Sequence, residues 1–170
     1  MEKALRELNR LKREGIIGDY AIGGGIAVLY YAEPVLTYDL DIFASLPETP
    51  GGLVDIPRVY RHLQERGYTV KGRHIDIGGT LVELIPIPLG STLEKEAIEK
   101  ALDIIYKSVR TRVLGVEHLI AILLKAGRHK DLGHIRTLLD QADVDMKSLE
   151  DILERHGLRK RWLRFVEDGK

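Results

Sequence analysis

Two aspartates, Asp39 and Asp41, are the residues best placed to do chemistry, and they lie in the strand-like run TYDLDIFA at positions 37–44. Successive side chains of a strand point to opposite faces, so the two carboxylates share one face, while Leu40 and Ile42 point into the core behind them. Carboxylates one strand repeat apart can jointly hold a hard divalent cation such as Mg²⁺. The pair therefore predicts a metal site on one face of a strand.

The segment around this pair is acidic. No Lys or Arg occurs between Arg13 and Arg58, whereas seven Asp and Glu residues do. Crowded carboxylates without a counter-charge resist joint ionisation, so a distant basic side chain, a raised pKa or a cation must compensate. The alternative is that the pair forms the solvated face of an amphipathic edge strand, which is the more common origin of an isolated D-x-D.

A glycine triplet upstream favours the metal site over that alternative. Gly23, Gly24 and Gly25 follow the short apolar segment 20–22 and precede the apolar run 26–32, which predicts a strand, a turn and a buried helix. Glycines at such a turn allow positive φ and let a phosphate approach backbone N–H groups, and the helix N-terminus adds a favourable dipole. Taken alone, the same triplet could be a packing turn without a ligand.

Two other glycine-rich phosphate motifs do not fit. A Walker loop needs Gly-Lys-Ser/Thr, and no Lys is near. A dinucleotide fingerprint starting at Gly23 meets Val28 where its third glycine should stand, and two acids on the next strand differ from the single ribose-binding acid of that motif. A P-loop is excluded, and a Rossmann site is disfavoured.

The order of these motifs resembles the nucleotidyltransferase superfamily, which has the polymerase-β-like fold. The resemblance is carried by the turn GGGIA at 23–27 and the strand TYDLDI at 37–42. A third segment, LKAGRHKD at 124–131, is similar to the K…R-x-K-D signature of the small stand-alone AbiEii-type toxin nucleotidyltransferases. The resemblance covers roughly residues 16–140.

This resemblance implies nucleotidyl transfer, in which two Mg²⁺ ions activate an acceptor hydroxyl and stabilise the leaving pyrophosphate. Asp39 and Asp41 would be catalytic metal ligands, and a third carboxylate is expected on a later strand. Glu83, in the apolar run TLVELIP, is the preferred candidate. Asp76 is a rival, although its position before Gly78-Gly79 is typical of a hairpin.

The remaining site residues also follow from the resemblance. The expected nucleotide-binding residues are Gly23, Gly24, Gly25, Thr37, Lys125, Arg128, Lys130 and Asp131. Lys125 or Lys130 would reach the triphosphate or the strand acids. Read without the family, Asp131 suits the first turn of a helix, and an ion pair between it and Arg128 or Lys130 is an equally good interpretation.

The sequence departs from the superfamily at two positions. The turn commonly has Ser after Gly, and here Gly24 or Gly25 stands in its place, so backbone N–H groups alone would hold the phosphates. Glu83 replaces the usual third Asp. These departures motivate an alternative function, a non-catalytic nucleotide- or partner-binding module with the same fold. A toxin–antitoxin component is a further alternative, and the acceptor could be an RNA end, a protein or a small molecule.

The expected fold is α/β (α+β), a mixed sheet flanked by helices and followed by a C-terminal helical bundle. Residues 1–115 would form the catalytic part, and residues 116–170 a helical region packed on it as one compact unit. Predicted helices cover 2–14, 24–32, 55–66, 91–100 and much of the chain from 116; predicted strands cover 19–22, 37–44, 68–77, 80–87, 103–107 and 110–113. The loop 46–53 could be a lid or a crossover.

Composition limits the other function classes. The 170 residues carry 26 basic and 26 acidic side chains, which gives no global field for a polyanion. There is no cysteine, and no signal peptide or membrane-length apolar segment, so the expected location is the cytoplasm, without a membrane partner. The six histidines lack zinc-site spacing; His74 and His129 could approach the site but more often such histidines lie at the surface.

The basic C-terminal run 155–164 allows two interpretations. Trp162 and Phe165 could stack on bases of an RNA. Leu158, Trp162 and Phe165 also follow helical spacing, which favours an amphipathic helix that packs these side chains and leaves its cations in water. The second interpretation is preferred.

Overall fold

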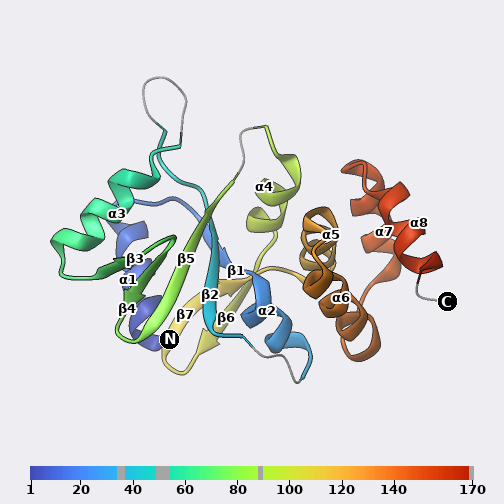
Figure 1. Cartoon of the computed structure of the whole chain (residues 1–170), viewed down its shortest axis with the longest axis horizontal. Helices are drawn as coiled ribbons and strands as arrows, with labels where there is room; N and C mark the ends of the chain where they lie inside the picture. The colour runs from blue at the N-terminus through green and yellow to red at the C-terminus, as the bar shows by residue number, and fades with distance from the viewer. Residues whose placement is uncertain (34–36, 49–53, 88–89, 169–170) are drawn as a thin grey trace.

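The computed structural model describes residues 1–33, 37–48, 54–87 and 90–168, and within them the chain forms a seven-stranded mixed sheet and eight helices (Figure 1). The strands are β1 Tyr20–Ile22, β2 Asp39–Ala44, β3 Thr69–Lys71, β4 His74–Ile77, β5 Thr80–Pro86, β6 Leu102–Tyr106 and β7 Val109–Val113. The helices are α1 Glu2–Arg13, α2 Gly24–Tyr31, α3 Ile56–Glu65, α4 Thr92–Glu99, α5 Val116–Ala126, α6 His129–Gln141, α7 Met146–Arg155 and α8 Arg159–Glu167. The expected mixed α/β fold is confirmed.

The sheet places β2 beside β5, although a helix and two strands separate them in the chain. The strand order is β3-β4-β5-β2-β1-β7-β6. β2 runs parallel to β5, with Asp41 opposite Glu83, and β1 runs parallel to β7. The other neighbours are antiparallel. This register brings acidic side chains from two strands onto one face.

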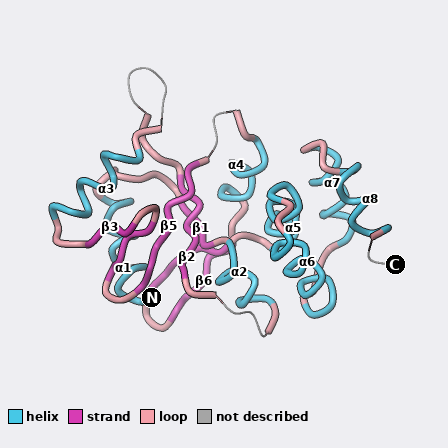
Figure 2. The backbone as a smooth tube through the Cα atoms, viewed as in Figure 1, coloured by secondary structure: helices cyan, strands magenta, loops and turns pink. Residues whose placement is uncertain are grey.

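Helices cover both faces of the sheet. Figure 1 shows α1 and α3 on one side and α2 and α4 on the other, with α5 to α8 stacked beyond α2 and α4. The tube in Figure 2 shows the same separation between the strands and the C-terminal helices. The acidic face of β2 is the one that meets α2, so the space between the sheet and the C-terminal helices is where a site can form.

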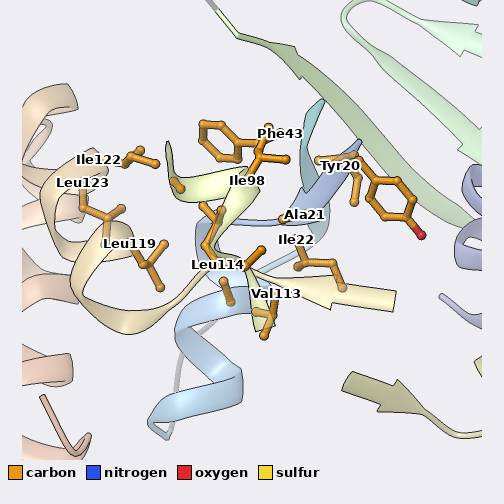
Figure 3. Packing of buried hydrophobic residues seen from close by; sticks show 14 of the residues in the cluster. Tyr20, Ala21, Ile22, Phe43, Ile98, Val113, Leu114, Leu119, Ile122 and Leu123 are labelled. Atoms are coloured by element: carbon orange, nitrogen blue, oxygen red, sulfur yellow. The ribbon is translucent and has the colours of Figure 1, made fainter. Parts of the chain in front are cut away.

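The core joins the sheet to these helices (Figure 3). On β2, Leu40 and Ile42 are buried as alternation predicts. α5 is buried over most of its length because α2, α4, α6 and α7 all pack against it. Burying one such Leu or Ile side chain contributes about 1.5–3 kcal/mol. The labelled side chains that meet here are Tyr20, Ala21, Ile22, Phe43, Ile98, Val113, Leu114, Leu119, Ile122 and Leu123.

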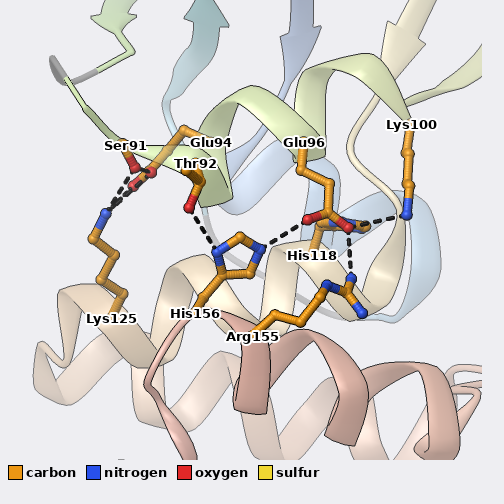
Figure 4. A network of polar contacts seen from close by, with 9 residues as sticks. All are labelled: Ser91, Thr92, Glu94, Glu96, Lys100, His118, Lys125, Arg155 and His156. Carbon is orange, nitrogen blue, oxygen red and sulfur yellow. Dashed lines mark hydrogen bonds and ion pairs between the residues drawn. The ribbon is translucent and has the colours of Figure 1, made fainter.

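One carboxylate ties α4 to the C-terminal helices (Figure 4). Glu96 accepts hydrogen bonds from Lys100 at 3.0 Å and Arg155 at 2.7 Å, and it lies 2.8 Å from His156 Nε2 and 3.3 Å from His118 Nε2. Burial opposes ionisation of Glu96, but these four partners outweigh it and hold its pKa well below the ordinary value. Glu96 is therefore a charged anchor between α4, α5 and α7.

The C-terminal aromatic residues pack inside the protein. Leu158, Trp162 and Phe165 are buried, and the Trp162 and Phe165 rings stack with their centroids 5.6 Å apart. The packing interpretation of the 155–164 run is confirmed, since buried rings cannot stack on a base.

The predicted elements agree with the structure to within a few residues, with one division. The extended segment 68–77 is split into β3 and β4, because Gly72 adopts positive φ and turns the chain after Lys71. Most of the loop 46–53 lies outside the described residues. Among the described helices, none has the length and apolar character needed to cross a membrane.

Candidate active site

Acidic side chains from β2 and β5 and a histidine from β4 form one cluster. Asp41 pairs with Glu83 across the parallel strands, and Glu83 pairs with His74 across the antiparallel ones. Paired residues project to the same face, and Asp39 shares it because it lies two residues before Asp41. The structure thus brings Asp39, Asp41 and Glu83 together.

His74 lies between two of these carboxylates. Its Nε2 atom is 3.4 Å from Asp39 Oδ2 and 3.7 Å from Glu83 Oε2. The ligand atoms of Asp39, His74 and Glu83 all lie within 4.8 Å of one another. The Nε2 atom is buried but is aligned for no hydrogen bond. Arg73 also approaches Glu83, with its Nε 3.2 Å from Oε2.

The pKa of Asp41 reflects its burial among like charges. Burial and, to a smaller extent, the neighbouring Asp39 and Glu83 charges raise its pKa to about 6, with Lys130 and Arg128 opposing them in part. A carboxyl that resists ionisation near neutral pH indicates a site in which a cation would be stabilised.

The glycine turn places the start of α2 directly against these acids. Gly24 has a φ of 54° and faces the Asp41 carboxylate so closely that a Cβ would overlap it. A Cβ at Gly25 would lie 2.7 Å from the Thr37 side chain. No side chain caps the first turn of α2. Its N–H groups are therefore available for an anion beside the carboxylates.

Two cavities meet at the acids. The larger has a volume of about 480 Å³ and joins the acidic face to an apolar wall on α5, and the other, of about 410 Å³, shares Asp39, Asp41 and Lys130 with it. The larger is lined by Gly24, Asp39, Asp41, Phe43, Arg73, Glu83, Ile85, Glu94, Leu119, Ile122, Leu123, Lys125, Ala126, Arg128 and Lys130. The second adds Gly25, Thr37, Tyr38, His74, Leu81 and His134.

Lys125 lines the larger cavity but does not contact the strand acids. Its Nζ lies 2.7 Å and 3.0 Å from the two carboxylate oxygens of Glu94, on α4, and 3.2 Å from Ser91 Oγ (Figure 4). Glu94 is buried, and its carboxylate also accepts from Ser91. Of the two alternatives, Lys125 or Lys130, the structure does not bring Lys125 to Asp39 and Asp41, because its charge is paired with Glu94.

Arg128 and Asp131 form a capping unit at the start of α6. Asp131 is only 1% exposed; it accepts from the Arg128 Nε at 2.7 Å and from the Arg128 backbone N–H at 3.2 Å. Asp131 was expected among the nucleotide-binding residues, but it lines neither cavity. The ion-pair interpretation describes it better, and Asp131 positions the Arg128 guanidinium at the cavity wall.

Lys130 is the cation that faces both cavities. It is exposed, it makes no ion pair with any of the described acids, and it lies near enough to Asp41 to lower that group's pKa. Of the predicted basic residues, Lys130 therefore has the free charge that a phosphate would need.

Asp76 shares the face of the acidic cluster but is engaged in its hairpin. It forms an ion pair with Lys71 at 3.0 Å and accepts the Gly79 N–H at 2.8 Å, and these two bonds lower its pKa. Asp76 pairs with Leu81, whereas Glu83 pairs with Asp41. The geometry thus favours Glu83 over Asp76 as the third carboxylate.

The sequence did not single out Arg73, Glu94 or His134 as site residues, and it named His74 only as a histidine that could approach the site. His74 had one usable signal, since it alternates with Asp76 on a strand that precedes the Glu83 strand by a tight turn. Glu94 and His134 lie on helices whose docking brings them near the cavities, and only tertiary packing decides that.

Comparisons with known proteins agree with this architecture. No protein-family model matches the chain, and no curated protein matches it in sequence. Among solved structures, an antigenic nucleotidyltransferase-like protein from Paracoccidioides brasiliensis is similar, with a TM-score of 0.51 and 15% identity over 80% of this chain and 72% of that one.

Two structures of ANT(2")-Ia are also similar. The crystal structure in complex with adenylyl-2"-tobramycin has a TM-score of 0.52 and 13% identity, over 94% of this chain and 97% of that one. The solution structure of this antibiotic-resistance factor has the same TM-score and identity, over 99% and 98%. Identities this low show a shared fold. The chain has a nucleotidyltransferase-like fold, as expected, and the AbiEii-type affiliation stays a prediction.

Proposed function

We propose that this protein is a Mg²⁺-dependent nucleotidyltransferase that moves a nucleoside monophosphate from an NTP to an acceptor hydroxyl. The observation that carries the proposal is the meeting of the Asp39, Asp41 and Glu83 carboxylates with the uncapped N-terminus of α2 at a cavity of about 480 Å³. The nucleotidyltransferase-like fold supports it.

The residues present fit a divalent cation. Oxygen ligands from Asp39 and Glu83 lie close together, and burial together with these two acids raises the pKa of Asp41 beside them. We expect Asp39, Asp41 and Glu83 to hold two such ions. When bound, they polarise the phosphate and lower the pKa of the attacking hydroxyl.

The chain's own groups then bind and orient the NTP. The N–H groups at Gly24 and Gly25 would hold the β- and γ-phosphates, with Lys130 and Arg128 supplying positive charge from α6. The base would lie against the apolar wall formed by Leu119, Ile122 and Leu123. This arrangement points the α-phosphate at the carboxylates.

Transfer forms a bond between the acceptor oxygen and the α-phosphorus and breaks the bond to the β-phosphate oxygen, so pyrophosphate leaves. The hydroxyl proton passes to a carboxylate, and Glu83 is our candidate acceptor of that proton. ANT(2")-Ia has been solved with adenylyl-2"-tobramycin, so small hydroxyl compounds should be tested as acceptors alongside RNA and proteins.

Isothermal titration of each NTP, with Mg²⁺ and again with a chelator, tests the proposal. We expect binding that needs the metal and is lost in Asp39→Asn. Asp140→Asn, an exposed change on α6, is the matched control and should bind as the wild type does. Transfer is then followed with labelled NTP. Failure of every NTP to bind the folded wild-type protein would refute the proposal.

A non-catalytic nucleotide-binding module is the second candidate. The Arg73 ion pair to Glu83 favours it, because a carboxylate paired with a guanidinium is less free to accept the hydroxyl proton. This candidate predicts metal-dependent NTP binding with no transfer to any acceptor and no pyrophosphate release.

A further inference from the structure

We propose that His74 is itself a metal ligand, so that the site selects a first-row transition cation such as Mn²⁺ over Mg²⁺. The inference rests on the metal site of the proposed function but goes beyond it, because it adds a nitrogen donor to a set of carboxylates. It also explains why a buried imidazole nitrogen without a hydrogen-bond partner lies beside two carboxylates.

The sheet itself positions this nitrogen. His74 is opposite Glu83 in the β4–β5 register, and Glu83 is opposite Asp41 in the β5–β2 register. Three adjacent strands therefore present an imidazole and carboxylates on one face. In the part of the chain that the structure describes, Asp39, His74 and Glu83 are the one group of three such ligands whose donor atoms converge.

The Nε2 atom of His74 has no hydrogen-bond partner. It lies 3.4 Å from Asp39 and 3.7 Å from Glu83, yet it is aligned to donate to neither, and its surface is buried. A histidine serving as counter-ion would point an N–H at one carboxylate. A buried polar atom without a partner is costly, and a metal between the three groups would satisfy it.

The chemistry of the donor set decides the class of metal. Mg²⁺ takes oxygen ligands and keeps several waters. Imidazole nitrogen suits first-row transition ions, and affinity for a site containing nitrogen rises from Mn²⁺ towards the later members. Mn²⁺ accepts the carboxylates as well as the nitrogen, which makes it the best probe of this mixed set.

His62 provides a matched control. Its Nε2 atom is also buried without a hydrogen bond, and it lies 3.4 Å from a single carboxylate, that of Glu14. His62 thus shares the burial and the acidic neighbour of His74 but lies outside the converging group. A general effect of losing a buried histidine would appear in both variants.

The direct test is pulsed electron paramagnetic resonance of Mn²⁺ added to the full chain. We expect nitrogen hyperfine coupling from a bound imidazole in the wild type and in His62→Gln, and none in His74→Gln. Titration calorimetry should show Mn²⁺ binding more tightly than Mg²⁺. The Mn²⁺ affinity should fall about 10-fold or more in His74→Gln, because loss of a partner in the outer shell already costs that much and loss of a direct ligand should cost no less.

Absence of nitrogen coupling in the wild type, or no Mn²⁺ binding at all, would overturn the inference without recourse to any variant. The NTP titration separates this failure from failure of the proposed function. Nucleotide binding with Mg²⁺ and no nitrogen coupling leaves the function and removes the His74 ligand. Nitrogen coupling in a protein that binds no NTP leaves the ligand and removes the function.

Discussion

Asp41 reaches the first turn of α2 because Gly24 has no side chain: a Cβ at residue 24 would overlap the Asp41 carboxylate. The same glycine has positive φ, which an L-residue adopts at a cost. Two independent constraints thus act at one position, one from the backbone and one from the neighbouring acid.

Gly24→Ala should therefore damage both the fold and the site. We expect a loss of at least about 1–2 kcal/mol from the left-handed backbone alone, and weaker NTP binding because Asp41 must move. Urea unfolding and the Mg²⁺-NTP titration measure the two effects. Gly133→Ala on α6, where a Cβ meets nothing, should be neutral or stabilising by up to about 1 kcal/mol. Equal effects of the two changes would contradict this account.

Asp41→Asn should stabilise the metal-free protein while abolishing metal-dependent NTP binding. The folded-state pKa, about 6, exceeds the ordinary 3.8, so the folded state binds more protons between these values and its stability falls as pH rises through that window. At one unit per 1.36 kcal/mol, the ionised group costs about 2–3 kcal/mol at pH 7. Thermal unfolding with a chelator present checks this, and a lower melting temperature in the variant would count against it.

Asp131→Ala should destabilise the protein and leave the nucleotide site largely working. The change removes the capping carboxylate at the start of α6. It also leaves the Arg128 backbone N–H and guanidinium without their acceptor, at a cost of about 1–3 kcal/mol. Asp140→Ala, exposed on the same helix, should be nearly neutral. A stable Asp131→Ala protein that no longer binds NTP would instead make Asp131 a direct ligand.

Lys130→Ala should weaken NTP binding without affecting folding. A charge-assisted hydrogen bond to phosphate is worth about 1.5–3 kcal/mol, or at least about a tenfold change in affinity. Lys147→Ala, an exposed lysine on α7, is the control. Lys125→Ala, in contrast to Lys130→Ala, should lower stability, because it leaves the buried Glu94 carboxylate without its ion-pair partner. If Lys130→Ala bound NTP as tightly as the control, Lys130 would have no phosphate role.

His118 should lower the free energy of unfolding as pH falls below about 6.5, opposite in sign to the contribution of Asp41. Burial lowers the pKa of His118 below its ordinary 6.5, although Glu96 opposes the shift. The unfolded chain then takes up a proton that the folded chain refuses, so the free energy of unfolding falls with pH in this range. His134, whose pKa burial also lowers, adds the same sign. In urea unfolding from pH 8 to 5.5, the stability of His118→Gln relative to the wild type should therefore rise as the pH is lowered.

Alternation and glycine placement allowed much of the site to be predicted from the sequence. The pattern at 39–42 gave the face of the two aspartates, and Glu83 stood out as a polar residue in an apolar strand. The pairing of Glu83 with Asp41 depends on β5 lying beside β2 in that exact register. Local pattern does not encode strand order, so this step came from the resemblance.

Long-range partners explain the misses. Lys125 had no local signal that it would pair with Glu94, a residue 31 positions earlier on a different helix. Asp131 had two interpretations, and burial, which helix docking determines, separates them. His74 was named as able to approach the site but was not chosen, because zinc-type spacing along one helix is the usual signal for a histidine ligand, whereas here the candidate donors come from three strands.

Glu96 has a consequence for how this protein can change over evolutionary time. Its carboxylate is shared by Lys100, His118, Arg155 and His156, which come from three helices. Replacing Glu96 alone would leave Lys100 and Arg155 without their shared counter-ion, and replacing one partner alone would weaken the contact between the helices. Positions 96, 118, 155 and 156 should therefore change together in sequences that descend from this one. The contact between the sheet-bearing part and the C-terminal helices would then be kept or lost as a unit.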